Sequence, residues 1–391
     1  MTDPSLRPHY DVVIVGARVA GAATAMRLAE AGLRVLVFDK GRYGADTLST
    51  HALMRPAVML LDRWGVLPAI RDAGTPAVRK TTFRYSDDET QSVQSIDIRP
   101  RHGVDSLFAP RRTVLDRALV DAAEQAGADV RFGMRFVELL GDPHDQVRGV
   151  IVEDRRGGRR EIGASLVIGA DGRSSRVAAS VGAAKYTTGR YASATVYGYF
   201  AGLPVDGNRW YYRPGMGAGA IPTNQGDTLV FASIMDRDAT SPRAMRNGFR
   251  ATVVASAPDL GAALDRAELR GKMWFFPGMV SYLRQPWGSG WALVGDAGYM
   301  SDPITAHGIT NALRDAELLS RAVIEHRHLG SYQLARDDLS QTFFEVSDRV
   351  ASYDWDIPTV QQYHRIMSQE MKREEDMIVQ SVPPRNSAAA A

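Results

Sequence analysis

Three acidic residues, Asp39, Asp171 and Asp296, each end or follow a short apolar segment and lie within two residues of a glycine. Short apolar segments of this kind are typical of buried strands, and the parallel strands of one sheet present their carboxyl ends at a common edge. Carboxylates at such an edge can accept hydrogen bonds from the hydroxyl groups of a sugar or a polyol. Together the three stretches predict a site for an extended cofactor.

The stretch from Tyr10 to Lys40 has the order strand, glycine turn, helix, strand and acid that begins a dinucleotide-binding fold. Gly16 permits the tight turn out of the first strand, and Gly21 lets the helix pack against the sheet. The N-terminus of the helix can then face a pyrophosphate. Asp39 lies 23 residues after Gly16, close to the usual spacing of about 20 for the acid that binds a ribose hydroxyl.

One position departs from the usual glycine pattern, because Arg18 occupies the place of the middle glycine. That glycine normally lets the backbone approach the phosphates closely. An arginine there either blocks the site or makes a charged contact to the pyrophosphate through its guanidinium. We expect the second, because the strands, turn, helix and acid around it are complete.

The stretch around Asp296 extends the predicted site beyond a single nucleotide. Asp296 is placed to reach the polyol of a longer cofactor, and the residues Gly308 to Thr310 open a helix. Free backbone N–H groups at that helix start can stabilise negative charge on the N1/O2 edge of a flavin. A cofactor of this length indicates FAD rather than NAD. The polar loop from Lys40 to His51, which includes Thr50, is expected to line it.

The remaining pattern predicts an α/β fold in which a Rossmann-like (βαβ) FAD-binding domain is interleaved with a β-sheet-rich substrate domain. We expect the FAD-binding domain to comprise residues 10–77, 106–182 and 286–330, and the sheet domain 78–105 and 183–285. Residues 331–382 are expected to form C-terminal helices, and 383–391 a disordered tail of low complexity. One helix is expected from Ala52 to Trp64, on the periodicity of its leucines.

Composition excludes several classes of function. The net charge of +2 gives no general attraction to nucleic acid, and the arginines at Arg155 to Arg160 lack interleaved aromatic residues, so we interpret them as a solvated hairpin tip. The absence of cysteine excludes disulfides, thiolate metal sites and a cysteinyl–flavin bond. We therefore expect a non-covalent FAD and no metal. No apolar run is long enough for a membrane span, and we expect a cytoplasmic protein.

In these motifs the chain resembles the para-hydroxybenzoate-hydroxylase-like flavoprotein monooxygenases, a group that overlaps with geranylgeranyl-reductase-like enzymes and flavin-dependent halogenases. The resemblance covers roughly residues 10–325. It rests on the dinucleotide pattern ending at Asp39, on Asp171-Gly172, on Gly295-Asp296 followed by Pro303 and Gly308, and on Arg112 in the pattern R-x-x-L-D-x-x-L. Each motif alone is weak, but four in this order are specific.

The resemblance implies a role for each matching residue. Gly16, Gly21 and Asp39, with Arg18 as the departure, would bind the ADP half of FAD, and Arg112 its phosphate or ribityl region. Asp171 and Gly172 would contact FAD and the transient NADPH or NADH, and Gly295-Asp296 the ribityl chain. The segment from Pro303 through Gly308 to Ile309 would run along the isoalloxazine. Thr305 and Ala178 stand where many relatives have glycine and arginine, which bears mainly on how NAD(P)H docks.

Two histidines and two aromatic residues are candidates for the chemistry itself. His51 and His307 lie in segments that would flank the flavin, and either can move a proton, orient a substrate or serve only as a hydrogen-bonded structural residue. Tyr299 is expected to pack. Trp210 and Tyr212 can line an aromatic substrate pocket, because alternate residues of a strand share one face and Tyr211 then points away.

The resemblance implies a monooxygenase in which reduced flavin and O2 form a C4a-hydroperoxide that hydroxylates or epoxidises a small or polycyclic, aromatic molecule of specialised metabolism. The alternatives are a flavin-dependent reductase of alkenes, a halogenase, and a flavin-binding protein without turnover. The segment from Tyr353 to Pro358 nearly matches the halogenase motif W-x-W-x-I-P, but it follows Gly295-Asp296 instead of preceding it. The expected partners are the organic substrate, O2 and NAD(P)H, and the oligomeric state is not determined by these motifs.

Overall fold

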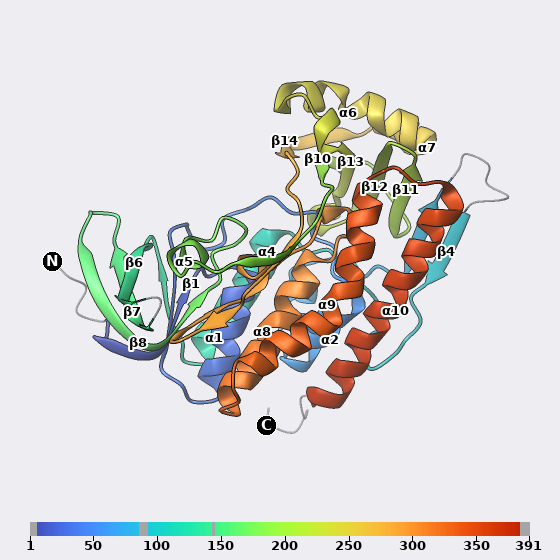
Figure 1. Ribbon diagram of the computed structural model, residues 1–391. Coiled ribbons are helices and arrows are strands. Elements are labelled where there is room, and N and C mark those ends of the chain that lie inside the picture. Colours follow the sequence, from blue (N-terminus) through green and yellow to red (C-terminus); the bar gives the residue numbers. More distant parts are fainter. Residues whose placement is uncertain (1–5, 86–92, 143–144, 384–391) are drawn as a thin grey trace.

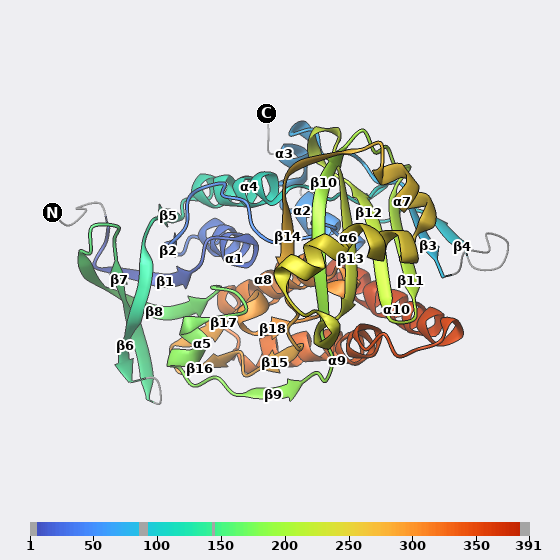
Figure 2. The same cartoon turned by 90° about the horizontal axis from the view of Figure 1, so that it is seen from above.

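The structure, a computed structural model, describes residues 6–85, 93–142 and 145–383. Two large sheets and a small one divide it, with helices packed against both large sheets (Figure 1 and Figure 2). The expected α/β fold, with a Rossmann-like unit, a second sheet and C-terminal helices, is confirmed. The expected domain boundaries stay a prediction, and residues 384–391 of the expected tail lie outside the described residues.

A sheet of eight strands holds the N-terminus of the chain. Its main path runs in the order β16 (Trp287–Gly288), β17 (Trp291–Leu293), β8 (Arg159–Gly169), β1 (His9–Val15), β2 (Val35–Asp39) and β5 (Asp129–Phe132), and β7 (Gln146–Glu153) and β6 (Arg135–Asp142) continue from β8. Parallel pairs join β17 to β8, β8 to β1, β1 to β2, and β2 to β5. The carboxyl ends of these strands therefore share one edge, as the three acidic stretches predicted.

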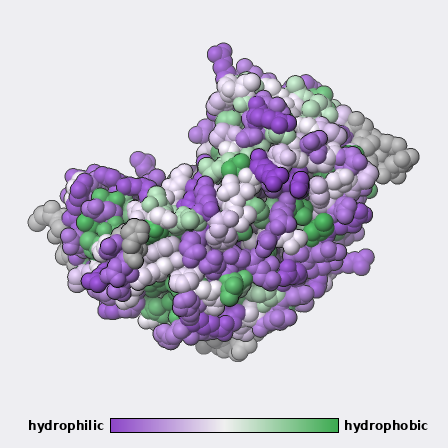
Figure 3. All heavy atoms as spheres, in the orientation of Figure 1, coloured by the Kyte–Doolittle hydropathy of each residue, from purple (hydrophilic) through white to green (hydrophobic). Residues whose placement is uncertain are grey.

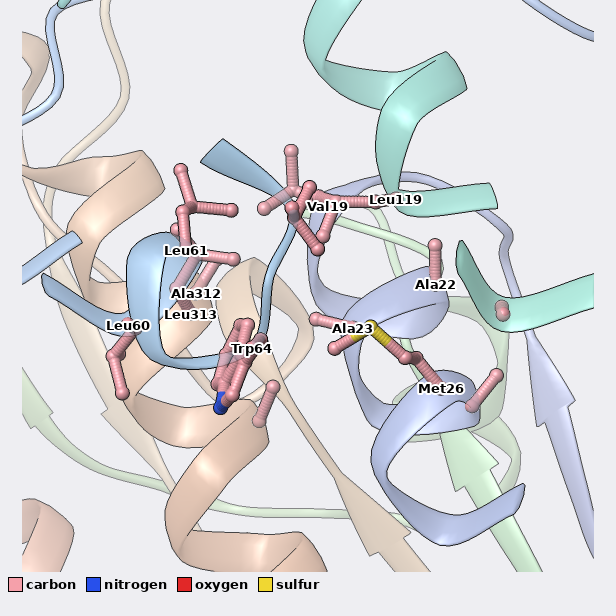
Figure 4. Packing of buried hydrophobic residues seen from close by; sticks show 14 of the residues in the cluster. Val19, Ala22, Ala23, Met26, Leu60, Leu61, Trp64, Leu119, Ala312 and Leu313 are labelled. Carbon is pink, nitrogen blue, oxygen red and sulfur yellow. The ribbon is translucent and has the colours of Figure 1, made fainter. Parts of the chain in front are cut away.

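Both faces of this sheet are buried. Val12 and Ile14 of β1 pack toward the helices, whereas Val13 and Val15 pack with side chains of β6, β7 and β8, the alternation that a strand covered on both faces requires. The helices here are α1 (Val19–Glu30), α2 (Arg55–Arg63), α3 (Leu67–Asp72), α4 (Arg112–Gln125) and α8 (Gly308–Ile324), and α5 (Arg176–Ser180) lies beside β6 and β8. Figure 4 shows Ala23 and Met26 of α1 directed toward Trp64, which follows α2 and lies against α8.

A seven-stranded sheet forms the second unit. Its order is β14 (Glu268–Phe276), β10 (Ser193–Ala201), β13 (Thr228–Met235), β12 (Met216–Pro222), β11 (Asn208–Arg213), β3 (Lys80–Arg84) and β4 (Val93–Asp97). One face packs on α6 (Pro242–Ser256) and α7 (Pro258–Leu264), and the opposite face packs on α9 (Gly330–Ala351) and α10 (Ile357–Ser381) (Figure 1). The small sheet contains β18 (Tyr299–Met300), β15 (Tyr282–Arg284) and β9 (Lys185–Thr188).

The helix expected from Ala52 begins later, at Arg55. The backbone N–H of Leu53 donates to the carbonyl of Phe108 at 2.9 Å, and the two residues form a β-bridge. Met54 is also extended, with φ −78° and ψ 164°. Leu53 therefore contributes to the core from an extended segment, although its spacing from the other leucines fits a helix.

The face of the molecule in Figure 3 is mostly hydrophilic, with small separate hydrophobic areas. Within the described ranges, no helix combines the length and the apolar character that crossing a membrane requires.

Candidate functional site

The turn after β1 is shaped by two glycines that no other residue can replace without rearrangement. Gly16 has φ +104°, and a Cβ there would lie 2.5 Å from the carbonyl oxygen of Ala170, the residue after β8. A Cβ at Gly21 would lie 1.8 Å from the carbonyl oxygen of Gly16. These contacts hold α1 close to the ends of β1 and β8, as the sequence pattern predicted.

The N-terminus of α1 is open to an anion. The first N–H bonded within the helix is that of Ala22, which donates to the carbonyl of Arg18 at 2.8 Å. The N-cap residue Arg18 makes no side-chain hydrogen bond to the helix in the described structure, and the first turn of the helix has no acidic residue. The N–H groups of Val19 to Gly21 therefore lack a backbone acceptor in the part of the chain that the structure describes, which is the arrangement that binds a phosphate.

Two arginines share one carboxylate beside this helix end. Arg18 Nη1 lies 3.1 Å from Asp116 Oδ2, and Arg112 donates to both oxygens of Asp116 at 2.8 and 3.1 Å. The Arg18 side chain is 38% exposed, so it lies at the edge of the site and does not block it. Two guanidinium groups and one carboxylate leave a net positive charge, which suits a pyrophosphate.

The Asp39 carboxylate fixes the glycine turn. It accepts hydrogen bonds from the N–H groups of Ala17 at 3.1 Å and Gly41 at 2.6 Å, and each oxygen has a further lone pair for a ribose hydroxyl. A hollow of about 260 Å³ lies beside it, between the turn and α4. Its lining includes Ala17, Arg18, Asp39, Asp116, Val120 and Phe132. The residues present therefore fit the ADP half of FAD, whereas Lys40 is exposed next to them.

The two other acids at this edge, Asp296 and Asp171, differ in whether their carboxylates have hydrogen-bond partners within the described protein. Asp296 is half-buried, and its carboxylate makes no hydrogen bond within the described part of the chain. Burial raises its pKa to about 6, against the opposing charges of Arg112 and Arg173. A carboxylate that is desolvated and without a partner fits the hydroxyl groups of a ribityl chain. Gly295, before it, has φ +60°, and a Cβ there would lie 2.8 Å from Ala20 Cβ.

Asp171 already has partners within the protein. Its Oδ1 accepts from Ser175 Oγ at 2.5 Å, and its Oδ2 accepts from the N–H groups of Arg176 at 2.7 Å and Val177 at 3.2 Å. The carboxylate thus satisfies the N-terminus of α5. This capping function was not anticipated from the Asp-Gly motif. Contact of Asp171 and Gly172, which has φ +80°, with FAD or NAD(P)H stays a prediction.

The segment before α8 presents backbone donors to the same region. Asp302 is fully buried and accepts from the Ile304 N–H at 2.9 Å, which starts the turn Pro303–Thr305. The first N–H bonded within α8 is that of Asn311, donating to the His307 carbonyl at 2.9 Å. The N–H groups from Gly308 to Thr310 are therefore unpaired in the helix, and Gly308 is exposed. This fits the N1/O2 edge of a flavin, with Ile309 and Pro303 nearby.

The His307 side chain belongs to a buried charged cluster. Its Nε2 lies 2.8 Å from Glu374 Oε2 of α10, and Glu374 Oε1 accepts from Arg314 at 2.5 Å. Burial tends to raise the pKa of Glu374, but His307 and Arg314 outweigh it and lower that pKa. The ring also lies 4.4 Å from that of Phe343. The imidazole is therefore held by α9 and α10, and a catalytic role for it stays a prediction.

His51 is buried and adopts φ +67°, a backbone conformation that is uncommon for a residue with a side chain. Its Nε2 forms a hydrogen bond with the Tyr199 hydroxyl, and the two rings stack at 5.7 Å. Burial, followed by the charges of Arg112 and Arg111, lowers the pKa of His51 well below its usual range. The imidazole is therefore neutral near pH 7, with Nδ1 unpartnered. The backbone of neighbouring Thr50 accepts from the Ala52 N–H at 2.9 Å.

Arg111 is a residue of this region that the sequence patterns did not identify. Its guanidinium carbon lies 3.6 Å from the centre of the Tyr199 ring, and its Nη2 lies 2.8 Å from Asp46 Oδ2. It thus joins the loop after β2 to the aromatic face of the seven-stranded sheet. The only signal in the sequence was its position before Arg112.

An apolar cavity of about 550 Å³ lies between the seven-stranded sheet, α9, α10 and the turn before α8. It is lined by Met54, Thr81, Phe83, Leu107, Asn208, Trp210, Tyr212, Ile304, Thr305, Phe343, His364, Met367 and Met371. Trp210 and Tyr212 face it as the strand alternation predicted, and Tyr211 points to the other face, where its hydroxyl donates to Asp259 at 2.9 Å. The contribution of α10 was missed, because its residues lie about 150 positions away in the chain.

The segment that resembles the halogenase motif connects α9 to α10. Trp355 Nε1 donates to the Val350 carbonyl at 2.9 Å, and Asp356 caps α10 by accepting from the Thr359 N–H at 2.9 Å. None of the described residues that line the cavity is a lysine. The segment therefore has a structural function in this chain.

Comparison with known proteins places these features in a family. Residues 9–338 match the family model described as "FAD binding domain". A digeranylgeranylglycerophospholipid reductase of Methanosarcina mazei is 26% identical over 351 residues, covering 85% of this chain and 79% of the reductase. Among solved structures, p-nitrophenol 4-monooxygenase PnpA of Pseudomonas putida (TM-score 0.75, 18% identity, 96% and 98% of the two chains) has the same fold. So does the myxobacterial chondrochloren halogenase CndH (TM-score 0.75, 19% identity, 95% and 91%).

Proposed function

The chain belongs to the FAD-binding-domain family, and on that premise we propose that it is a monooxygenase that uses NADPH or NADH and O2 to hydroxylate or epoxidise a small or polycyclic aromatic molecule. It is an FAD-dependent oxidoreductase. The finer proposal concerns the reaction that follows reduction and the class of substrate.

The observation that carries the proposal is the position of the apolar cavity. Ile304 and Thr305 line it, and they lie four and three residues before Gly308, where the unpaired N–H groups of α8 begin. Trp210 and Tyr212 supply aromatic surface from the opposite side. A planar substrate held there would lie next to the flavin ring that the α8 donors fit.

The residues of this chain would bind the cofactor at four places. The N-terminus of α1 and the pair Arg18 and Arg112 suit the pyrophosphate, Asp39 a ribose, Asp296 the ribityl hydroxyl groups, and the start of α8 the N1/O2 edge. A bound flavin would accept hydride from the nicotinamide and activate O2. The apolar lining would exclude water from the reacting atoms. His51, neutral and with Nδ1 unpartnered, would hold or pass one proton beside them.

A second candidate is a flavin-dependent reductase of alkenes. It is favoured by the reductases of archaeal lipids that match 85–87% of this chain at 24–26% identity. Such an enzyme would use the same FAD residues, and the methionines of the cavity would suit an isoprenoid chain. The two candidates differ in whether product formation consumes O2.

The test is made with the FAD-loaded protein. Under anaerobic conditions, NADPH and one member of a panel of phenols, polycyclic aromatics and isoprenoid alkenes are added while the flavin absorbance is followed. Isotopically labelled O2 is then admitted. The proposal expects bleaching of the flavin in the first step and an oxygenated product that carries the label in the second. A saturated product formed without O2 would instead establish the reductase, and a halogenated product that requires added halide would establish a halogenase. A protein that cannot be loaded with FAD, or whose flavin no nicotinamide reduces, would refute both oxidoreductase proposals.

A further inference from the structure

Among the polar side chains that line the mostly apolar cavity, three have a buried atom without a hydrogen-bond partner in the described structure. These atoms are Thr81 Oγ1, Asn208 Oδ1 and His364 Nε2. Thr81 and Asn208 are 8% and 4% exposed, respectively. Buried polar atoms normally find a partner, because leaving one unpaired destabilises the fold. Three such atoms around one cavity therefore indicate partners supplied by a ligand.

The three atoms mark two ends of the cavity. Asn208 and Thr81 face each other across the paired strands β11 and β3, so they form one polar end together. His364 of α10 lies against Tyr212, with ring centres 4.4 Å apart. Tyr212 is four residues further along β11 than Asn208. At about 3.3 Å per residue along a strand, the backbone positions of Asn208 and Tyr212 are roughly 13 Å apart, and His364 packs at the Tyr212 end. This separation suits a fused or linked ring system rather than a single ring.

The chemical character of the His364 end follows from its other nitrogen. Nδ1 lies 2.7 Å from the hydroxyl of Tyr85, whose only hydrogen-bond partner in the described structure is this nitrogen. A buried phenol directs its hydrogen to an available acceptor. If Tyr85 donates to Nδ1, a neutral imidazole carries its own hydrogen on Nε2. That nitrogen then offers a donor to the cavity.

None of the described residues that line the cavity carries a formal charge, except that His364 would become positively charged if it bound a proton. Burial lowers the pKa of His364 to about 4, so the ring is neutral under ordinary conditions. A carboxylate or ammonium group on a ligand would therefore lose its hydration and find no opposite charge. By contrast, a hydroxyl or carbonyl group would pair with Thr81, Asn208 or His364.

We propose that this cavity selects an uncharged, elongated aromatic molecule with a hydroxyl or carbonyl group at each end, bound by Asn208 and Thr81 at one end and by His364 at the other. The inference rests on the proposed function, because it assigns the cavity to the substrate. Thr81, Asn208 and His364 are then specificity-determining residues. Met367, Met371 and the aromatic residues of the lining supply the apolar contact between them.

The test measures binding to the FAD-loaded protein by calorimetry, without turnover. The probes are 4,4′-dihydroxybiphenyl, unsubstituted biphenyl, biphenyl-4,4′-dicarboxylate and geranylgeraniol. We expect the diol to bind at least about tenfold more tightly than biphenyl, because two polar ends are paired, and the dicarboxylate to bind most weakly. Equal affinity for the diol and biphenyl, or tighter binding of geranylgeraniol than of the diol, would overturn the inference.

Three variants test the assignment of the ends. Thr81→Val and Asn208→Leu remove atoms that make no hydrogen bond in the structure, so both proteins should fold and keep FAD. His364→Phe removes the other end. Each is expected to reduce the preference for the diol over biphenyl by about threefold to tenfold. The matched control is Met371→Leu, which changes the same cavity without changing its polar groups and should leave that preference intact. A loss of affinity shared equally by both probes would contradict the assignment.

This outcome is separable from that of the proposed function. A protein that prefers the diol but forms no oxygenated product keeps the cavity assignment and loses the monooxygenase. A protein that oxygenates a substrate but shows no preference for the diol keeps the monooxygenase and loses the assignment.

Discussion

Glu374 of the last helix lies 2.8 Å from His307, the residue that immediately precedes α8. Arg314, about two turns further along α8, contacts the other oxygen of the same carboxylate at 2.5 Å. One residue of α8 and the residue that precedes this helix are thus joined to α10 through a single buried side chain. The helix that contributes to the apolar cavity and the helix whose N-terminus fits the flavin are therefore connected.

Replacing Glu374 should lower both the stability of the protein and its binding of FAD. Glu374→Ala leaves His307 buried without its carboxylate and Arg314 paired with Asp315 alone, and breaking a buried ion pair costs up to about 3–5 kcal/mol of unfolding free energy. We expect a lower unfolding temperature and loss of FAD, measured by thermal unfolding and by flavin absorbance. Glu374→Gln, which keeps hydrogen-bonding groups at this position, should lose less stability and less FAD than Glu374→Ala. The control is Glu370→Gln, whose partner Arg373 is substantially exposed. A loss of similar size in that variant would show that the effect is general to α10.

Arg18 should contribute to FAD binding through its charge. With its guanidinium beside the α1 N-terminus, Arg18→Ala removes a positive charge and leaves Asp116 paired to Arg112 alone. We expect FAD affinity to fall about tenfold, whereas Arg18→Gly restores the usual glycine and keeps much of the affinity by allowing closer backbone approach. Affinity is measured by titrating the apoprotein with FAD and following flavin fluorescence. Equal retention of FAD by the two variants would mean that Arg18 only faces solvent.

The glycine turn and the positions of the acids at the sheet edge followed from local sequence patterns, whereas the binding of FAD by these residues stays a prediction. Gly16, Gly21 and Asp39 lie in one continuous stretch, and a glycine turn with a following acid has few structural solutions. The convergence of Asp39, Asp171 and Asp296 also followed, because parallel strands of one sheet share an edge. The alternation along β11 correctly separated Trp210 and Tyr212 from Tyr211.

The parts that sequence patterns did not predict depend on contacts between distant segments. His364 and Met367 reach the cavity from α10, and only the packing of that helix on the seven-stranded sheet brings them there. In the same way, Glu374 meets His307 across 67 positions. The capping role of Asp171 was missed for a different reason. Its partners are the backbone N–H groups of a five-residue helix, too short to give a periodic signal.

Asp296 and Asp171 should respond differently to the same change. Asp296→Ala removes a carboxylate without hydrogen-bond partners in the described protein, so we expect FAD affinity to fall with little change in the stability of the apoprotein. Asp171→Ala removes the acceptor of the Arg176 and Val177 N–H groups at the start of α5, whose N-cap residue is Ser175, and should reduce the unfolding free energy of the apoprotein by about 1 kcal/mol. Chemical denaturation of the apoprotein and FAD titration measure the two effects separately. The opposite pattern would reverse the assignment of the two acids.

His51 should affect turnover more than cofactor binding. His51→Gln keeps a hydrogen-bonding group near Tyr199, and Tyr199→Phe removes the partner of Nε2 while leaving the imidazole. If His51 holds a proton at Nδ1 for the reaction, His51→Gln should lower kcat about 100-fold and change the pH profile of kcat, with FAD content retained. A parallel fall in FAD content and kcat, with an unchanged pH profile, would instead assign His51 to positioning of the loop.

The burial of His364 should make the stability of the protein depend on pH below neutrality. The pKa of its imidazole is lowered to about 4 in the folded protein, whereas an unfolded histidine titrates near 6.5. Above pH 6.5 both states are neutral at this residue, so it contributes no pH dependence there. As the pH falls from about 6.5 to about 4, the unfolded chain binds a proton that the folded protein does not, and stability is lost by up to about 3 kcal/mol.

His364→Phe should remove that part of the loss, measured by urea denaturation at pH 7.5 and pH 5. His328, whose ring packs against Trp287 outside the cavity, provides the control: His328→Phe should leave the difference between the two pH values unchanged. An equal pH dependence in the wild type and in His364→Phe would show that His364 does not remain neutral in the folded protein.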